Sequence, residues 1–123
     1  MKRVLIVDDA ATVRMYHKGV LNAAGYETDE AINGLEALEK ASGQAFDLYV
    51  VDVNMPKMDG YSFIRTLRQS PHIRQAPAMM VSTEAGEQDE VQAYKAGANL
   101  YVVKPVKPEQ LVQCAELLMG AEH

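Results

Sequence analysis

The sequence predicts an α/β fold, a doubly wound sheet of five parallel strands that alternate with five helices. Two observations lead to this class. Short apolar runs recur along the chain without polar alternation, and amphipathic stretches with helical spacing lie between them. Such runs are typical of strands that are buried on both faces of a parallel sheet. Because the crossovers between parallel strands are right-handed, we expect helices on both faces of the sheet.

Five segments are expected as strands. Four of them are continuous apolar runs, and the second in chain order is weaker. The five segments are residues 4–7, 26–31, 48–51, 78–81 and 100–103.

Helices are expected in the intervening stretches, because apolar residues recur there every three or four positions and so share one face. Gly25 and Gly97 follow alanines where a left-handed glycine would end a helix. Asn33 and Asp59 are expected as N-caps, and Pro108 suits a first turn. The expected buried faces are Val13, Tyr16, Val20 and Ala24; Gly34, Ala37, Leu38 and Ala41; Phe63, Ile64 and Leu67; Val91 and Tyr94; and Leu111, Ala115 and Leu118.

The composition is that of one ordinary globular domain, which we expect to span residues 1–123. The net charge of −5 argues against direct binding to nucleic acid, which needs clustered basic residues. The one cysteine, Cys114, cannot form an internal disulfide and falls in the last helical pattern, so we expect a core position and a reducing, cytoplasmic compartment. The apolar runs are too short for a membrane span or a signal peptide, so no membrane partner is expected.

Polar residues follow four of the five predicted strands. Because parallel strands end at the same edge, these residues should lie together, where doubly wound sheets form their sites. They are Asp8 and Asp9 after the first strand, Asp52 after the third, Ser82 and Thr83 after the fourth, and Lys104 after the fifth.

Three carboxylates at one edge repel one another, by about 4 kcal/mol for a pair ~4 Å apart at an effective dielectric of about 20. Lys104 supplies one positive charge, and Mg²⁺, which accepts oxygen ligands and shares its shell with phosphate, would supply more. His17, His72 and His123 lack the spacing of metal ligands and are expected to be ordinary residues. A carboxylate beside Mg²⁺ can attack a phosphoryl group and form an acyl phosphate, whose oxygens Ser82, Lys104 and backbone N–H groups would neutralise.

Each of these residues has a plainer interpretation when it is taken alone. The joint placement at four strand ends favours a functional site over chance. The plainer roles are a cap of a helix starting at Ala10 for Asp9, a turn for Asp52, a cap of the fourth helix for Ser82 or Thr83, and a solvated side chain for Lys104.

Five motifs follow one another over nearly the whole chain: VLIVDDA (4–10), AINGLEAL (31–38), DLYVVDVNMPKMDG (47–60), MMVSTEA (79–85) and KAGANLYVVKP (95–105). In this order they resemble the receiver domains of two-component response regulators, and within that family the stand-alone chemotaxis receivers. The resemblance implies a flavodoxin-like (β/α)5 fold with strand order 2-1-3-4-5. It also implies a signalling protein rather than an enzyme, one that catalyses only its own phosphorylation and dephosphorylation.

The resemblance implies that Asp52 accepts a phosphoryl group from a histidine kinase or a phosphotransfer protein, with Mg²⁺ as cofactor. Asp9, Asp52 and the backbone carbonyl of Asn54 would be Mg²⁺ ligands, and Asp8 would act largely through water.

The resemblance also implies a switch that follows phosphorylation. Ser82 and Lys104 would be drawn to the phosphoryl group, and Tyr101 would turn inward as the switch aromatic, although by pattern alone Tyr101 is more simply a core residue. The Lys104–Pro105 bond would be cis. The face made by the fourth helix, the fifth strand and the fifth helix would then change its affinity for a protein target.

Asn54, Thr83 and Glu84 flank the acceptor and are expected to tune the lifetime of the acyl phosphate, because they can orient or obstruct the attacking water. Thr83 departs from the family pattern, in which Ala or Gly is usual. Val106 is smaller than the apolar residue common after the Lys-Pro pair, which leaves the identity of the partner open.

Several other functions remain as alternatives. Within the family, the chain could be a phosphorelay intermediate or the receiver part of a larger regulator or hybrid kinase. Outside it, a phosphorylation-independent interaction module would use the same fold. A phosphohydrolase is disfavoured because Asn54 stands where a second acid is usual, and a nucleotide-binding module is disfavoured because residues 8–11 are acidic and glycine-free.

Overall fold

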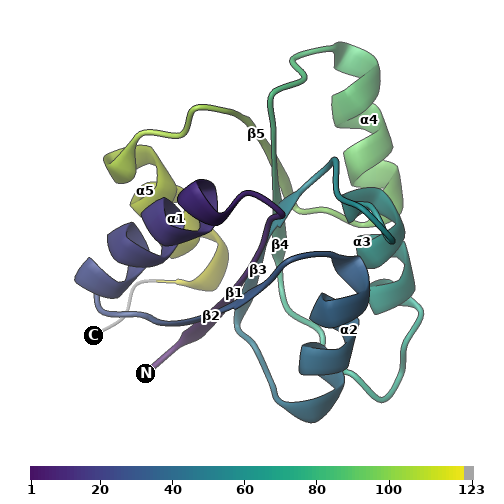
Figure 1. Ribbon diagram of the computed structural model, residues 1–123, viewed down its shortest axis with the longest axis horizontal. Helices are drawn as coiled ribbons and strands as arrows, with labels where there is room; N and C mark the ends of the chain where they lie inside the picture. Colours follow the sequence, from purple (N-terminus) through teal and green to yellow (C-terminus); the bar gives the residue numbers. More distant parts are fainter. Residues whose placement is uncertain (121–123) are drawn as a thin grey trace.

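The computed structural model describes residues 1–120 as one sheet with helices on both faces (Figure 1). All five strands are parallel, in the order β2-β1-β3-β4-β5. This flavodoxin-like arrangement confirms the predicted fold class and strand order. In chain order the elements are β1 (Arg3–Val7), α1 (Ala11–Ala23), β2 (Glu27–Ala31), α2 (Gly34–Gly43), β3 (Leu48–Asp52), α3 (Gly60–Arg68), β4 (Ala78–Ser82), α4 (Glu87–Ala96), β5 (Leu100–Val103) and α5 (Pro108–Met119).

The central strands are continuous apolar runs because both of their faces are covered. β3 and β4 are buried almost throughout, and so is β1 after its first residue. β2 lies at an edge, has the sequence ETDEA and buries only Ala31, which explains its weak signal in the sequence. Each strand begins and ends within one residue of the predicted segment.

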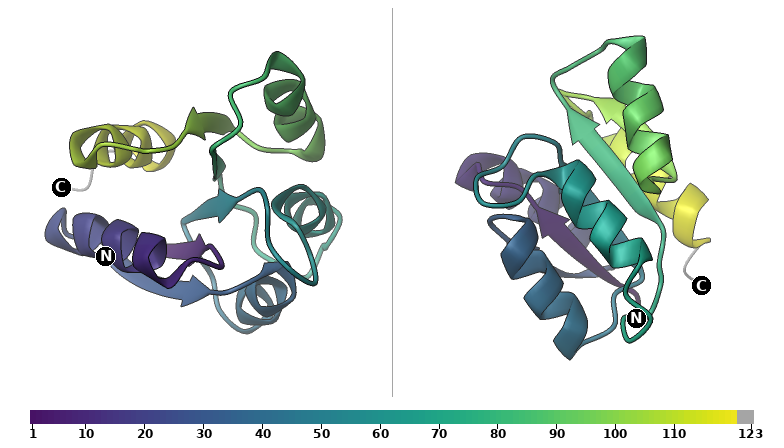
Figure 2. Two further views of the ribbon diagram at one scale, coloured as in Figure 1. Left: turned by 45° about the horizontal axis from the view of Figure 1, so that its top comes forward. Right: turned by 90° about the vertical axis from the view of Figure 1, so that its right-hand side faces the viewer.

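Successive residues of the central strands point into two separate cores. In β1, Leu5 and Val7 pack beneath α2, α3 and α4, while Val4 and Ile6 pack beneath α1 and α5. Figures 1 and 2 show these two layers of helices on opposite sides of the sheet. The partly buried Cys114 of α5 packs against the second core, where a core position was expected.

The expected face of α1 is only partly right. Val20 packs against the core, but Tyr16 and Ala24 are exposed, and the fully buried residues are His17 and Leu21. The helix carries two apolar stripes, and the sequence favoured the one without a histidine. The packing of α1 against the sheet and α5 buries the other stripe, because a histidine offers a flat apolar body as well as polar atoms.

The expected face of α4 is wrong as well. Ala93 and Ala96 face the core, whereas Val91 and Tyr94 are 46% and 42% exposed. The small alanines allow α4 to approach the sheet closely, so the larger apolar residues remain outside. The other three faces are confirmed, with buried residues that include Gly34, Ala37 and Ala41 in α2, Phe63, Ile64 and Leu67 in α3, and Leu111 and Ala115 in α5.

The predicted helix ends are confirmed. The side chains of Asn33 and Asp59 each accept a hydrogen bond from a backbone N–H three residues later. Gly25 and Gly97 have φ angles of 99° and 114°, which suit glycine at the end of a helix, and Pro108 occupies the first turn of α5. Within residues 1–120, the helices lack the length and apolar character that crossing a membrane requires.

Candidate functional site

Three carboxylates meet at the carboxyl edge of the sheet. Val7 of β1 pairs with Val51 of β3, so Asp8 and Asp52 leave neighbouring strands side by side. Asp8, Asp9 and Asp52 each place a carboxylate oxygen within 4.8 Å of the other two. The side chains of Asp8 and Asp52 are only 4% and 11% exposed, whereas Asp9 is open to solvent.

Lys104 places an ammonium group between two of these carboxylates. Its Nζ donates to Oδ2 of Asp8 at 3.0 Å and to Oδ1 of Asp52 at 3.2 Å. Its backbone N–H donates to the carbonyl of Ser82 at 2.7 Å, which extends the pairing of β4 with β5, and the Lys104–Pro105 bond is cis. One ammonium faces three carboxylates, so negative charge remains in excess at this edge.

This charge distribution alters the proton affinities of the site. Burial raises the pKa of Asp52 to about 6, and the neighbouring Asp8 carboxylate adds to the rise, while Lys104 partly offsets it. Burial by itself would lower the pKa of Lys104, but its hydrogen bonds and charge attraction to Asp8 and Asp52 outweigh burial and raise it. Lys104 is therefore a firmly charged partner of both carboxylates.

The start of α1 excludes a capping role for Asp9. The helix begins at Ala11, and its N-cap is Ala10, without a hydrogen bond from a side chain. Asp8 instead organises this turn, because its Oδ1 accepts from the N–H of Ala10 at 2.9 Å. Arg14 donates to the backbone carbonyl of Asp8 at 2.8 Å and fixes the turn from the helix side.

Ser82 is 1% exposed at the end of β4, and its Oγ accepts from the N–H of Glu84 at 3.0 Å. Neither Ser82 nor Thr83 caps the fourth helix, because α4 has Gly86 as its N-cap. Thr83 and Glu84 are exposed in the loop that follows β4. The structure therefore places the Ser82 hydroxyl inside the edge and the two expected tuning residues on its rim.

Tyr101 connects β5 to the same loop. Its hydroxyl donates to the carbonyl of Glu84 at 2.7 Å, while its half-buried ring packs against the core beneath α2, α3 and α4. Tyr101 therefore combines core packing with a polar contact to the loop after β4.

The loop between β3 and α3 follows Asp52. Asn54 is exposed at its start, and Lys57 has a φ of 67°, a conformation that L side chains seldom adopt. Gly60 ends the loop, and a Cβ at that position would collide with the backbone of Asp52. The close approach of α3 to β3 thus requires glycine.

Two residues of α1 approach this edge without having been expected there. The hydroxyl of Tyr16 donates to the carbonyl of Val106 at 2.9 Å. His17 is buried, its Nδ1 lacks a hydrogen-bond partner within the described residues, and burial lowers its pKa while Asp8 pulls it upward and Lys104 downward. The position of His17 on one face of the α1 helix could have indicated its burial. The hydrogen bond of Tyr16 joins residues 90 positions apart, and no local sequence pattern predicts it.

The donor set fits a hard divalent cation such as Mg²⁺. Asp8, Asp9 and Asp52 form the group of acidic, histidine or cysteine side chains that could share an ion within residues 1–120, and all of their donor atoms are oxygens. Of the expected ordinary histidines, His17 is buried and His72 exposed, and His123 lies outside the described residues.

Comparisons with known proteins agree with this fold. The sequence model of the response regulator receiver domain matches residues 4–116. The chain is 37% identical over 120 residues to chemotaxis protein CheY1 of Helicobacter pylori, covering 96% of this chain and 97% of that protein. It is 41% identical over 115 residues to chemotaxis protein CheY of Thermotoga maritima, covering 91% and 92%.

Solved structures show the same relationship. The structure of the chemotaxis response regulator CheY4 of Vibrio cholerae superimposes with a TM-score of 0.90 at 36% identity, over 96% of this chain and 98% of that one. The chain belongs to the response regulator receiver domain family and is similar over nearly its whole length to receivers of the CheY type.

Proposed function

We propose that this chain is a single-domain response regulator that accepts a phosphoryl group on Asp52 from a histidine kinase or a phosphotransfer protein. The observation that carries the proposal is the position of Asp52, which lies at the end of β3 within reach of two further carboxylates and of the Lys104 ammonium. A nucleophilic oxygen, a place for a divalent cation and a fixed positive charge are the groups that phosphoryl transfer needs.

In the proposed reaction, a carboxylate oxygen of Asp52 attacks the phosphorus of a phosphohistidine. The phosphorus–nitrogen bond breaks, its electron pair stays on the imidazole, which takes up a proton, and an acyl phosphate forms on Asp52. Asp9, Asp52 and the carbonyl of Asn54 would hold Mg²⁺, with Asp8 acting through water. When bound, Mg²⁺ neutralises charge on the phosphoryl oxygens.

Lys104 and Ser82 would act on the product. The Nζ of Lys104 already lies 3.2 Å from Oδ1 of Asp52. Its ammonium group can therefore pair with a phosphoryl oxygen on Asp52 after a short movement. The Ser82 hydroxyl would donate to another oxygen and would be drawn from its contact with the Glu84 N–H. Because Tyr101 bonds to the Glu84 carbonyl, a shift of this loop would change the position of Tyr101.

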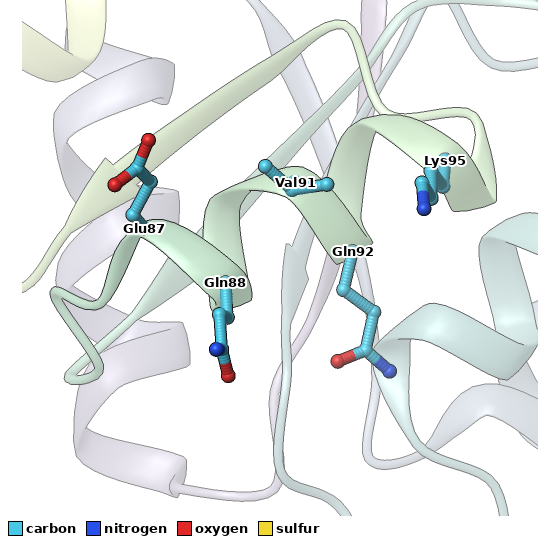
Figure 3. Close-up of a pocket in the computed structure, with 5 residues that line it drawn as sticks. All are labelled: Glu87, Gln88, Val91, Gln92 and Lys95. Carbon is cyan, nitrogen blue, oxygen red and sulfur yellow. The ribbon is translucent and has the colours of Figure 1, made fainter.

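The output would be binding of a protein target to the face formed by α4, β5 and α5. Val91, Tyr94 and Val103 are each more than 40% exposed on this face. Figure 3 shows the residues that line a shallow hollow on α4, which are Glu87, Gln88, Val91, Gln92 and Lys95. An apolar side chain surrounded by polar ones is typical of a protein contact surface. We place the protein in the cytoplasm, where its kinase and target would be found.

The test is phosphorylation of the purified chain by acetyl phosphate, with Mg²⁺ or with EDTA, in the wild type and in Asp52→Asn. Phosphate-affinity gel mobility gives the readout because the acyl phosphate is labile. We expect a Mg²⁺-dependent shift that is lost in the variant. The absence of a shift both with acetyl phosphate and with phosphorylated donor proteins would contradict the proposal and would favour a phosphorylation-independent interaction module.

A further inference from the structure

Tyr16 of α1 is hydrogen-bonded to the segment that carries Lys104. Its hydroxyl donates to the carbonyl of Val106 at 2.9 Å, although the two residues are 90 positions apart in the sequence. Figure 1 shows that α1 lies beside the connection between β5 and α5. Val106 is only two residues beyond Lys104, so this bond reaches the backbone that supports the ammonium group.

The backbone around Lys104 is held on both sides. Before it, the Lys104 N–H donates to the carbonyl of Ser82. After it, the Val106 side chain is 3% exposed in the core beneath α1 and α5, and the Val106 carbonyl accepts from Tyr16. A lysine side chain has four rotatable carbon–carbon bonds. The hydrogen bonds to Asp8 and Asp52 hold its end, and the backbone sets the point from which the side chain reaches them.

Tyr16 is itself held in place despite its exposure. Its ring is 41% exposed, but it contacts the ring of His17 with centroids 5.5 Å apart and planes inclined at 47°. His17 is 3% exposed and therefore gives Tyr16 a fixed neighbour. The hydroxyl of Tyr16 is thus directed at Val106 by packing.

We propose that Tyr16 is a positioning residue for phosphoryl transfer, which holds the Lys104–Val106 segment so that the Lys104 ammonium stays against Asp8 and Asp52. The inference rests on the proposed role of Asp52 as phosphoacceptor. Tyr16 touches none of the reacting atoms and acts through the backbone. Without its hydroxyl, the segment would sample more positions, and Lys104 would meet the transferred group less often.

The test uses Tyr16→Phe, which removes only the hydroxyl, beside Tyr49→Phe as a matched control. Tyr49 is 0% exposed in the core beneath α2, α3 and α4, and its hydroxyl has no hydrogen-bond partner within the described residues. We expect Tyr16→Phe to be phosphorylated by acetyl phosphate about two- to fivefold more slowly than wild type, the size of effect that loss of one neutral hydrogen bond produces. Tyr49→Phe should keep the wild-type rate.

Mg²⁺ affinity separates positioning from general damage. A looser Lys104 competes less for Asp8 and Asp52, so Tyr16→Phe should bind Mg²⁺ at least as tightly as wild type in a calorimetric titration. A slower rate with weaker Mg²⁺ binding would overturn the inference, because it would indicate a generally distorted site. An unchanged rate would overturn it as well.

A measurement without phosphate distinguishes this inference from the proposed function. In metal-free protein, the NMR signals of the Lys104 and Val106 amides should shift in Tyr16→Phe and stay in place in Tyr49→Phe. If they stay in place in both variants, Tyr16 does not position Lys104, whatever Asp52 accepts. If they shift but wild type is not phosphorylated at all, the proposed function fails, and with it the inference about transfer.

Discussion

The amino ends and the carboxyl ends of the strands both carry charged side chains, but their charges are balanced differently. At the amino ends, Arg3 pairs with Glu27 at 2.8 Å, and Arg74 pairs with Asp47 at 3.2 Å. The side chains of Arg3, Glu27 and Arg74 are 40% to 62% exposed, Asp47 is 22% exposed, and each cation has its own anion.

At the carboxyl ends, one ammonium serves a group of three carboxylates. Lys104, Asp8 and Asp52 are all less than one fifth exposed, so water compensates little of the excess negative charge. A balanced, exposed group of charges needs nothing further. A buried group with excess charge lowers the stability of the fold. Such groups are concentrated at functional sites, so the carboxyl ends are the better indicator of function.

The largest effect is expected from Lys104→Met. Removing the cation leaves Asp8 and Asp52 buried without a positively charged partner. We expect this to lower the free energy of unfolding by about 2–3 kcal/mol in EDTA, somewhat less than for a fully enclosed pair. Urea denaturation would measure it. Mg²⁺ should recover part of the loss, because a divalent cation can replace the missing charge, and a loss of less than about 1 kcal/mol would contradict this picture.

A smaller effect of opposite sign is expected from Asp52→Asn. The pKa of Asp52 is about 6 in the folded protein, above its ordinary value of 3.8, so the folded state binds the proton more tightly than the unfolded chain. The ionised carboxylate therefore destabilises the fold, fully above about pH 6 and no longer below about pH 4.

We therefore expect Asp52→Asn to be about 1–3 kcal/mol more stable than wild type at pH 7 in EDTA. The difference should shrink as the pH falls from 6 to 4. Thermal unfolding at a series of pH values would show it, and a constant difference across that range would mean that ionisation of Asp52 is not its cause.

At the amino ends of the strands, Arg3→Met should lower the free energy of unfolding by about 1 kcal/mol or less, because exposed ion pairs contribute little to stability. The loss should also shrink in about 1 M salt, which screens exposed charges. Urea denaturation under the same conditions as for Lys104→Met gives the direct comparison between the two ends. A loss as large as that of Lys104→Met would remove the distinction.

The smallest effect is expected at Thr83, beside the carboxylates at the carboxyl ends of the strands, and it concerns the rate at which phosphate is lost. Thr83 is exposed next to Ser82. We propose that its branched side chain narrows the access of water to the acyl phosphate, and Thr83→Ala removes that side chain. We expect the phosphorylated protein to lose its phosphate about twofold faster, which corresponds to about 0.4 kcal/mol in the barrier. Release of phosphate after removal of the donor is the measurement, and an unchanged decay rate would show that Thr83 does not shield the acyl phosphate.

The positions of the strands and of the edge residues could be predicted because both depend on local signals. A run such as residues 48–51 is apolar for its whole length, and the parallel arrangement then brings Asp8, Asp52 and Lys104 to one edge. The helix faces were harder to predict. α1 and α4 each offer two possible stripes, and only contact with the sheet decides between Tyr16 and His17, or between Val91 and Ala93.

Contacts between distant segments had no signal in the sequence. The bond from Tyr16 to Val106 joins residues 90 positions apart and depends on the closure of the whole fold. The contact of Ser82 with the Glu84 N–H could not be separated from a helix cap until the start of α4 was known.

The way α4 is attached has a consequence for local opening. α3 is anchored by large residues such as Phe63, Ile64 and Leu67, but α4 buries only Ala93 and Ala96. Apolar burial stabilises by about 25 cal/mol per Å², so two alanines hold a helix far more weakly than three large side chains do. The amide hydrogens of α4 should therefore exchange with solvent through small local openings, earlier than those of α3. A helix that detaches at so little cost can change its position without loosening the sheet beneath it.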